Sequence, residues 1–414
     1  MFYKTHTLIF VLLTTIQPWS NTSRTHIFKT LSEQLNHYEI NEYPRYEDLT
    51  LVYVEMAFTI LSFSSISVID MDYTLNLEVK QRWMDSRLRL ANHTGLYNII
   101  TFKDRIWRPD VYFRNSKDGS IHKVPVPKEM LKLDVNTGMI VFTQTMSVKL
   151  SCDMNLWKFP MDIQYCFIDI GSYSYEKKQL KLRWWLTNGT YGYYPKGDYS
   201  LDFSSAISVH KNLRMSEFEK PTTSCCFCKK ESTDLGDFPC LTGVFKLERK
   251  YGFYITYVYI PSLMVLLVCW LSFFIDYTSA PARVSICVFS ILSIISQGST
   301  TVSTLPKVSY PKAIDWWIFS CFSLVILSFI EYVLVNYYHG LQLKDQISTR
   351  FYRITKAEPM QVERIFRIAF PILVSLLVVI YWSFYLTSSD IVVKCNDMIN
   401  TKTKIIEVVD GENN

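Results

Sequence analysis

Histidine is scarce in this chain: there are seven among 414 residues, and their scatter gives no metal-binding constellation. The sequence also lacks a nucleophile elbow, the ligand spacing of a zinc site and a glycine-rich phosphate loop. These absences argue against an enzyme, with a membrane-anchored enzyme as a distant alternative, and no cofactor is expected. The net charge of +5 is small and spread along the chain, which argues against nucleic acid as a partner.

The N-terminus carries a short apolar segment, residues 7–16. It is too short to cross a bilayer and is typical of a secretory signal peptide, here predicted for residues 1–20, with an uncleaved anchor as the alternative. Export places the chain in an oxidising compartment where disulfides persist. The Asn-X-Thr sequons at Asn92 and Asn188 predict glycosylation on the outer side.

Residues 45–250 have the pattern of a β-rich domain. Apolar and polar residues alternate over residues 75–83, which is the period of a half-buried strand, and residues 139–150 have a similar extended, β-branched character. Turn sequences such as Asn136-Thr137-Gly138 interrupt the region. Many short strands separated by turns predict an all-β, immunoglobulin-like sandwich.

Four apolar segments follow, each near the ~20 residues with which a helix crosses a lipid bilayer, and they are uncharged except for Glu331 in the third. A buried helix of a soluble protein would explain one such segment but not four. Residues 339–364 hold an excess of Lys and Arg, which predicts that they are cytoplasmic. We therefore expect an extracellular domain over 21–250, a four-helix membrane domain over 251–386 and an extracellular tail over 387–414. The predicted spans are residues 252–275, 284–305, 316–338 and 368–386.

The second span is seeded with small hydroxyl side chains. Intervals of four and three residues place on one helix face Ser285, Phe289, Leu292, Ser296, Ser299 and Ser303. Polar stripes within a membrane usually face water or the interior of a bundle. A Ser-rich helix-packing face is the alternative.

Cys152 and Cys166 enclose thirteen residues that include Phe159-Pro160-Met161-Asp162. Such a loop, followed by four membrane spans, resembles the Cys-loop receptors, the pentameric neurotransmitter-gated ion channels. The resemblance implies a sandwich on a four-helix membrane domain, a homo- or hetero-pentamer and a bridge between these two cysteines. Closing a loop of this size contributes about 3 kcal/mol in the chain-entropy model.

The flanks of the second span resemble the anion-selective branch of that family, the glycine-, GABA- and glutamate-gated chloride channels. Pro281-Ala282-Arg283 precedes the stripe, and no acidic residue lies where cation channels carry a Glu ring. The resemblance implies chloride as the permeant ion, with Arg283 adding positive potential at the mouth. It also implies that Ser285 and Ser296 line the pore and that Leu292 forms its hydrophobic constriction.

Phe289 and Cys287 depart from the family, which usually has Thr and Gly at these positions. Five aromatic rings at Phe289 would choke a homomeric pore, or the ring tilts into a helix interface. Phe289 therefore favours a second interpretation, a non-conducting or modulatory subunit of a heteromer.

The resemblance implies a small-molecule transmitter, an amine or amino acid, bound between subunits. On the principal face it implies contacts from Tyr173, from Phe238 on the capping loop, and from Tyr112 in the segment that begins Trp107-Arg108-Pro109-Asp110, where Trp107 is expected to be structural. An aromatic cage attracts an ammonium group by about 0.5–2 kcal/mol per contact. A capping-loop bridge from Cys228 to Cys240 is also implied.

On the complementary face the resemblance points to Lys80, Glu78 and Thr143. Glycine and glutamate receptors have Arg in place of Lys80, an aromatic residue in place of Glu78 and a second Arg in place of Thr145. Lys keeps the charge but loses the bidentate fork that suits a carboxylate. These departures favour an amine over glutamate.

Coupling between the ligand site and the pore is implied to pass through the disulfide-closed loop, Arg249 and the linker after the second span. The residues concerned are Phe159, Pro160, Asp162, Arg249, Lys307 and Tyr310. The expected location is the plasma membrane, postsynaptic or on a neuronal or muscle surface.

Overall fold

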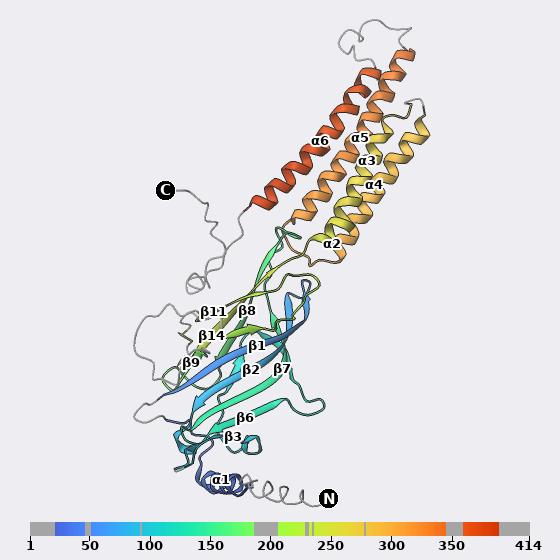
Figure 1. Cartoon of the computed structure of the whole chain (residues 1–414). Helices are drawn as coiled ribbons and strands as arrows, with labels where there is room; N and C mark the ends of the chain where they lie inside the picture. The colour runs from blue at the N-terminus through green and yellow to red at the C-terminus, as the bar shows by residue number, and fades with distance from the viewer. Residues whose placement is uncertain are drawn as a thin grey trace, which may run out of the picture.

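The computed structural model shows an elongated molecule in which a β-rich half and a helical half lie end to end (Figure 1). It describes residues 21–45, 51–91, 93–185, 206–227, 232–233, 236–276, 279–344 and 359–388. The predicted signal peptide lies outside these ranges, as do both sequon asparagines, Asn92 and Asn188, and most of the predicted tail.

Two stacked sheets form the β-rich half and confirm the predicted sandwich. The larger sheet runs in the order β10 (Ile207–Val209), β1 (Val52–Ser67), β2 (Asp72–Met84), β7 (Met139–Ser151), β6 (Glu129–Asp134) and β3 (Leu96–Asn98). In addition, β9 (Leu180–Trp184) pairs with β1, and β5 (Ser116–Ile121) pairs with β7. The smaller sheet consists of β11 (Thr222–Phe227), β14 (Cys240–Glu248), β8 (Ile163–Ser172) and β4 (Val111–Phe113). A separate hairpin joins β12 (Ser232–Thr233) to β13 (Gly236–Asp237).

Strand β2 shows how alternation builds the core between the sheets. Leu75, Leu77, Val79 and Trp83 are buried while the intervening side chains are half-buried, as the period-two pattern predicts. The hydroxyl of Tyr73 crosses to the smaller sheet and donates to the Phe167 carbonyl at 2.6 Å. Both predicted strands are therefore present, because β2 covers residues 75–83 and β7 covers residues 139–150.

The turn at Asn136-Thr137-Gly138 also forms as predicted. Gly138 has a φ of +75°, a backbone conformation that favours glycine. A Cβ at this position would lie 2.4 Å from the Asp85 carbonyl oxygen, so the turn requires glycine for space as well.

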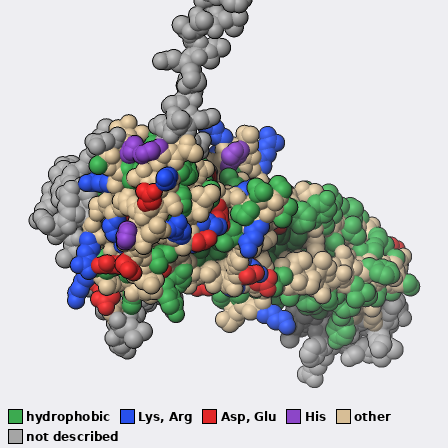
Figure 2. Space-filling view, turned by 90° about the horizontal axis from the view of Figure 1, so that it is seen from below, with side chains coloured by type: hydrophobic (Ala, Val, Ile, Leu, Met, Phe, Trp, Pro, Cys, Tyr) green, Lys and Arg blue, Asp and Glu red, His purple; other side chains and the backbone are tan. Residues whose placement is uncertain are grey.

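Four helical segments are long and apolar enough to cross a membrane. The first comprises α2 (Gly252–Tyr254), the π-helical η5 (Ile255–Tyr259) and α3 (Ile260–Ser272); the others are α4 (Ala280–Ser303), α5 (Ala313–Lys344) and α6 (Pro359–Thr387). Hydrophobic side chains cover this half, whereas charged ones gather over the sandwich (Figure 2). Helices α5 and α6 both run into the predicted cytoplasmic range 339–364. At the opposite tip lies α1 (Asn21–Gln34), followed by the 3-10 turn η1 (Leu35–His37) (Figure 1).

Short 3-10 turns complete the sandwich. They are η2 (Ser86–Leu88), which follows β2, and η3 (Ile100–Phe102), which follows β3.

Candidate functional site

An aromatic pair stands out from the smaller sheet. The rings of Tyr112 on β4 and Tyr173 after β8 meet edge to face, with centroids 5.7 Å apart. Tyr173 is 76 % exposed, so this pair presents an open aromatic surface. Asp110 holds the turn that carries Tyr173, because its carboxylate accepts from the Ser172 hydroxyl at 2.6 Å and from the Ser174 amide at 2.5 Å.

Trp107 has the structural place that the sequence predicted for it. Its ring is buried, and its indole N–H donates to the Tyr175 hydroxyl at 2.9 Å. The structure thus separates the aromatic residues of this region into a buried support and an exposed pair, a division that the sequence alone does not make.

The capping loop (residues 228–240) is tied to the turn after β8. The Lys177 ammonium lies 2.6 Å from the Asp237 carboxylate, and the Lys177 amide donates to the Asp237 carbonyl at 2.8 Å. Phe238 is half-buried next to this contact. Within the described part of the chain no ring contact joins Phe238 to Tyr112 or Tyr173.

The capping-loop cysteines only partly test the predicted pairing. Cys226 and Cys240 are each disulfide-bonded, while Cys228 lies outside the described residues, so the bridge from Cys228 to Cys240 stays a prediction. Cys225 is buried, and this burial raises the pKa of its thiol to about 12. Among the described residues no group of three or more His, Cys, Asp or Glu is placed to hold a metal ion.

The predicted complementary residues lie together on the larger sheet. The register pairs Lys80 with Thr143 and Glu78 with Thr145 across β2 and β7. The Lys80 ammonium is 3.6 Å from the Glu78 carboxylate and donates to the Thr59 hydroxyl at 3.4 Å. Lys80 therefore already has an acidic neighbour, which weakens its attraction for a ligand carboxylate.

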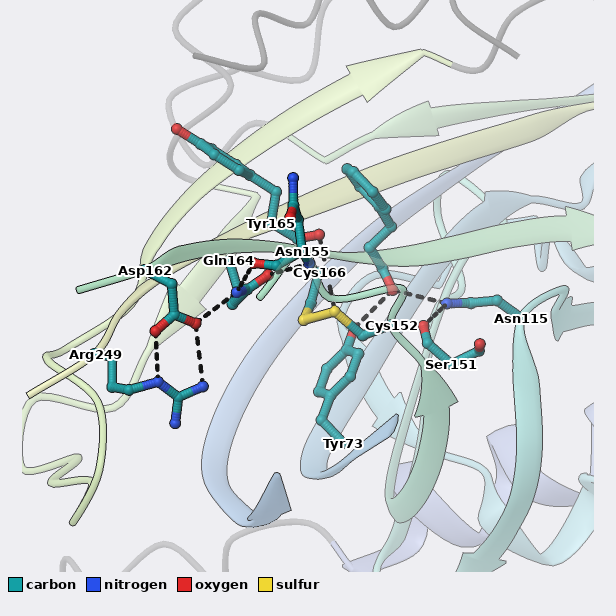
Figure 3. The surroundings of a disulfide bond; sticks show 11 residues. Tyr73, Asn115, Ser151, Cys152, Asn155, Asp162, Gln164, Tyr165, Cys166 and Arg249 are labelled. Atoms are coloured by element: carbon teal, nitrogen blue, oxygen red, sulfur yellow. Dashed lines mark hydrogen bonds and ion pairs between the residues drawn. A yellow bond between two sulfur atoms is a disulfide. The ribbon is translucent and has the colours of Figure 1, made fainter. Parts of the chain in front are cut away.

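The disulfide between Cys152 and Cys166 is present, with an S–S distance of 1.99 Å (Figure 3). Cys152 follows β7 and Cys166 lies in β8, so the bond joins the two sheets. It closes the segment 152–166, hereafter the disulfide loop.

An ion pair is buried at the end of the disulfide loop. The Arg249 guanidinium donates to both carboxylate oxygens of Asp162, Nε at 2.7 Å and Nη2 at 3.2 Å (Figure 3). Gln164 donates to the same carboxylate at 2.6 Å and to the Asn155 carbonyl at 2.7 Å. The Arg249 guanidinium also lies 4.8 Å from the centre of the Phe159 ring.

The disulfide loop rests directly on the helices. The backbone amides of Ala313 and Ile314, at the start of α5, donate to the carbonyls of Trp157 and Phe159 at 2.9 and 3.1 Å. The hydroxyl of Tyr310 accepts from the Leu156 amide at 3.1 Å. These bonds bring the α4–α5 linker against the loop.

Most of the predicted coupling residues therefore meet at this junction, where Pro160 is also buried. Lys307 is the exception: it is exposed and makes no hydrogen bond or ion pair with any residue that the structure describes. Two contacts were not predicted. Lys158 donates to the Ser388 carbonyl after α6 at 2.6 Å, and the Trp157 ring stacks on Phe384.

Helix α4 leaves the predicted stripe uncovered. All six stripe residues are exposed in the protomer, and so are Pro281 and Ala282 before them. Phe289 is 71 % exposed, so its ring does not pack into the protomer's own bundle. The face that packs against the other helices carries a different set, including Cys287, Ser290 and Ile294.

Arg283 does not lie on the uncovered face, contrary to the prediction that it lines the pore mouth. Its side chain is 1 % exposed. Nε donates to the Ile275 carbonyl at 2.8 Å, and Nη2 is hydrogen-bonded to Glu363 on α6. A guanidinium paired with a carboxylate inside the bundle adds little net positive potential to the opposite face of the helix.

Comparison with protein families agrees with both halves of the molecule. Residues 25–249 match the model of the neurotransmitter-gated ion-channel ligand binding domain, and residues 258–355 match that of the neurotransmitter-gated ion-channel transmembrane region. The first match alone covers more than half of the chain, and the observed disulfide loop, sandwich and four membrane-length helices lie within or beside these ranges. The chain therefore belongs to the neurotransmitter-gated ion-channel family.

Proposed function

We propose that this chain is a subunit of a pentameric chloride channel of the plasma membrane, opened by a small amine. The observation that carries the proposal is the uncovered face of α4. It presents small hydroxyls and Leu292, and the whole of α4 contains no Asp or Glu. The partial positive charge of a helix N-terminus favours anions, and in this chain it replaces the paired Arg283 as the source of positive potential.

An amine ligand is supported by the exposed pair of Tyr112 and Tyr173. An aromatic face attracts an ammonium group, and an exposed ring loses little packing when a ligand replaces water. A site that binds a carboxylate needs an unpaired cation. On the larger sheet Lys80 is paired with Glu78, and the Glu78 carboxylate suits an amine instead. The predicted sites on two separate sheets then face each other across a subunit boundary.

Reversal potentials test the selectivity. Cells that express the chain, alone and with related subunits, are exposed to a panel of small amines and amino acids while current is recorded. The current should reverse at the chloride equilibrium potential, and Ala282→Glu, which places five carboxylates on the uncovered face, should move reversal toward cations. A wild-type current that follows the sodium gradient would overturn the proposal.

Phe289 supports a second candidate, a subunit that conducts only beside partners with a smaller side chain at this position. Its exposed ring, repeated five times, would fill a homomeric pore. If the wild-type chain alone reaches the surface without current while Phe289→Thr conducts, the second candidate is favoured. Equal currents from both would exclude it.

A further inference from the structure

The end of the helix bundle farthest from the sandwich contains a buried cluster of charges to which α4, α5 and α6 all contribute. Arg283 comes from the first turn of α4, Glu331 from α5, and Glu363 with Arg367 from the start of α6. The carbonyls of Phe273 and Ile275, just after α3, complete it. All four membrane segments therefore converge on this cluster.

Glu363 has two basic partners in this cluster. Its carboxylate accepts from Nη2 of Arg283, and Nη2 of Arg367 lies 3.5 Å from the same oxygen. Arg367 is held in place by a second bond, from Nε to the Phe273 carbonyl at 2.9 Å. Glu363 thus ties α6 to the pore-facing helix.

Glu331 is the opposite case. It is 0 % exposed, and neither of its carboxylate oxygens has a hydrogen-bond partner among the described residues. The charged groups that act on it are Arg283, Glu363 and Arg367. A buried acidic group without a hydrogen-bond partner destabilises the folded chain. We therefore expect another state of the molecule in which Glu331 has such a partner.

Arg283 has the capacity to satisfy it. Nη1 of Arg283 is also buried and has no hydrogen-bond partner in the part of the chain that the structure describes, although Nε and Nη2 are both bonded. A guanidinium carries five N–H donors in a fixed fork and can therefore leave one carboxylate for another without being deprotonated. The donor without a partner and the acceptor without a partner sit on neighbouring helices, α4 and α5.

We propose that Glu331 is a gating residue, the acceptor that takes Arg283 from Glu363 when α4 moves as the channel opens. This inference rests on the proposed function, because it assumes that movement of α4 opens a pore. Each state keeps Arg283 paired with one buried carboxylate, which gives the two alternative arrangements that a two-state switch requires. Glu331 acts through Arg283 and does not itself touch the permeant ion.

The test compares two matched variants of the full-length chain, Glu331→Gln and Glu363→Gln. Since the agonist is not identified, both are placed in a Phe289→Thr/Leu292→Ser background, in which the narrowings of the uncovered face are removed and a standing current is expected. One measurement is the current per surface-labelled channel. The other is the temperature at which half of the detergent-extracted oligomer is lost.

Glu363→Gln should lower that temperature because it breaks the pair that this structure contains. Glu331→Gln should leave that temperature unchanged or raise it, because the carboxylate it removes is buried without a partner among the described residues, yet it should reduce the current per channel at least threefold. Glu331→Asp, which keeps the charge, should retain most of the current. Once Arg283 is replaced in Arg283→Met, Glu331→Gln should reduce the current no further.

Two results would overturn the inference. The first is that Glu331→Gln and Glu363→Gln lower the temperature of half-loss equally while the current per channel stays unchanged. The second is that Glu331→Gln and Glu331→Asp give equal currents. Absence of current from surface-labelled background channels would instead overturn the proposed conduction. The half-loss temperatures of Glu331→Gln and Glu363→Gln then still decide whether Glu331 is unpaired in the resting state or stabilises the fold.

Discussion

Asp162 and Arg249 show how a single pair can control the junction between the two halves of the molecule. Both side chains are almost fully buried, and the guanidinium also lies 4.5 Å from the centre of the Phe218 ring. Removing one member of a buried pair leaves an uncompensated charge, which typically costs 3–5 kcal/mol. Arg249→Met should therefore abolish most surface expression, as measured by surface biotinylation.

Lys246→Met provides the control for that variant, because Lys246 and Glu248, both in β14, form an ion pair at the surface. Exposed pairs of this kind contribute about 0–1 kcal/mol. If Arg249→Met and Lys246→Met reached the surface equally well, the junction would not depend on the buried pair.

Tyr173 is predicted to carry much of the agonist contact. Tyr173→Ala should raise the amine concentration for half-maximal activation by about tenfold, equivalent to about 1.4 kcal/mol. Tyr173→Phe retains the aromatic face and should shift the concentration much less. Dose–response curves measure both, and matching shifts for Ala and Phe would show that the hydroxyl, not the ring, binds the ligand.

Glu129 predicts a pH-dependent contribution to stability. The hydrogen bond from Lys103, at 2.6 Å, holds the pKa of Glu129 below its ordinary value of about 4.3. The pair therefore stabilises the fold at neutral pH, and its contribution is lost as the pH falls through the lowered pKa. Glu129→Gln should reduce the free energy of unfolding by about 1 kcal/mol at pH 7 and by less near pH 3.5.

Thermal unfolding at the two pH values would check this prediction. Glu42→Gln is the matched control, because Glu42 forms an exposed pair with Arg45. An equal loss for Glu129→Gln at both pH values would mean that the ion pair is not the cause.

At the scale of elements, the packing of strand β14 depends on one glycine. A Cβ at Gly243 would lie 2.5 Å from the Ile207 Cδ1 of β10 and 2.6 Å from the Ile168 Cγ2 of β8. Overpacking of this kind costs about 1–3 kcal/mol, so Gly243→Ala should lower the melting temperature of the extracted protein. At Gly119 on β5 the nearest atom would be 3.4 Å away, so Gly119→Ala should have little effect, and equal losses from both would contradict the packing argument.

Helix α4 shows which part of a site sequence periodicity can predict. The stripe from Ser285 to Ser303 follows the 3.6-residue repeat, so its residues share one helix face, and that face is exposed along its whole length. Arg283 lies two residues before Ser285, about 200° around the helix, so the same repeat places it on the buried side. Its assignment to the pore mouth followed the family position instead, and the structure corrects it.

The partners of Arg283 were beyond the reach of local patterns. Glu363 lies 80 residues further along the chain, and nothing in the spacing around either residue indicates that they meet. The same holds for Tyr259 and Tyr381, whose hydroxyls are 2.8 Å apart across α6 and the first membrane segment. Such contacts depend on helix packing, which the amphipathic pattern of a single helix does not determine.

For the whole molecule, the strands, the sandwich and the four membrane-length helices followed from alternation, turn residues and hydrophobic length. Two further features of the fold did not follow from these patterns. Helix α1 has no strong apolar pattern of its own, and its buried side chains, Ile27 and Leu31, pack on the sandwich core. The docking of α6 on the disulfide loop through Trp157 and Lys158 joins residues more than two hundred positions apart.

Because of that docking, the disulfide affects both halves of the molecule. The bond from Cys152 to Cys166 links both sheets, and the loop that it closes contacts α5, α6 and the α4–α5 linker. Loss of a 13-residue closure costs about 3 kcal/mol in the unfolded-state model and also frees the surface on which the helices rest. Cys152→Ala/Cys166→Ala should therefore prevent assembly and reduce surface biotinylation at least tenfold. Cys321→Ala removes a buried thiol inside the bundle that forms no disulfide and should reach the surface at close to the wild-type level. Normal surface labelling and current from the double variant would show that the helices hold the disulfide loop in place without its covalent closure.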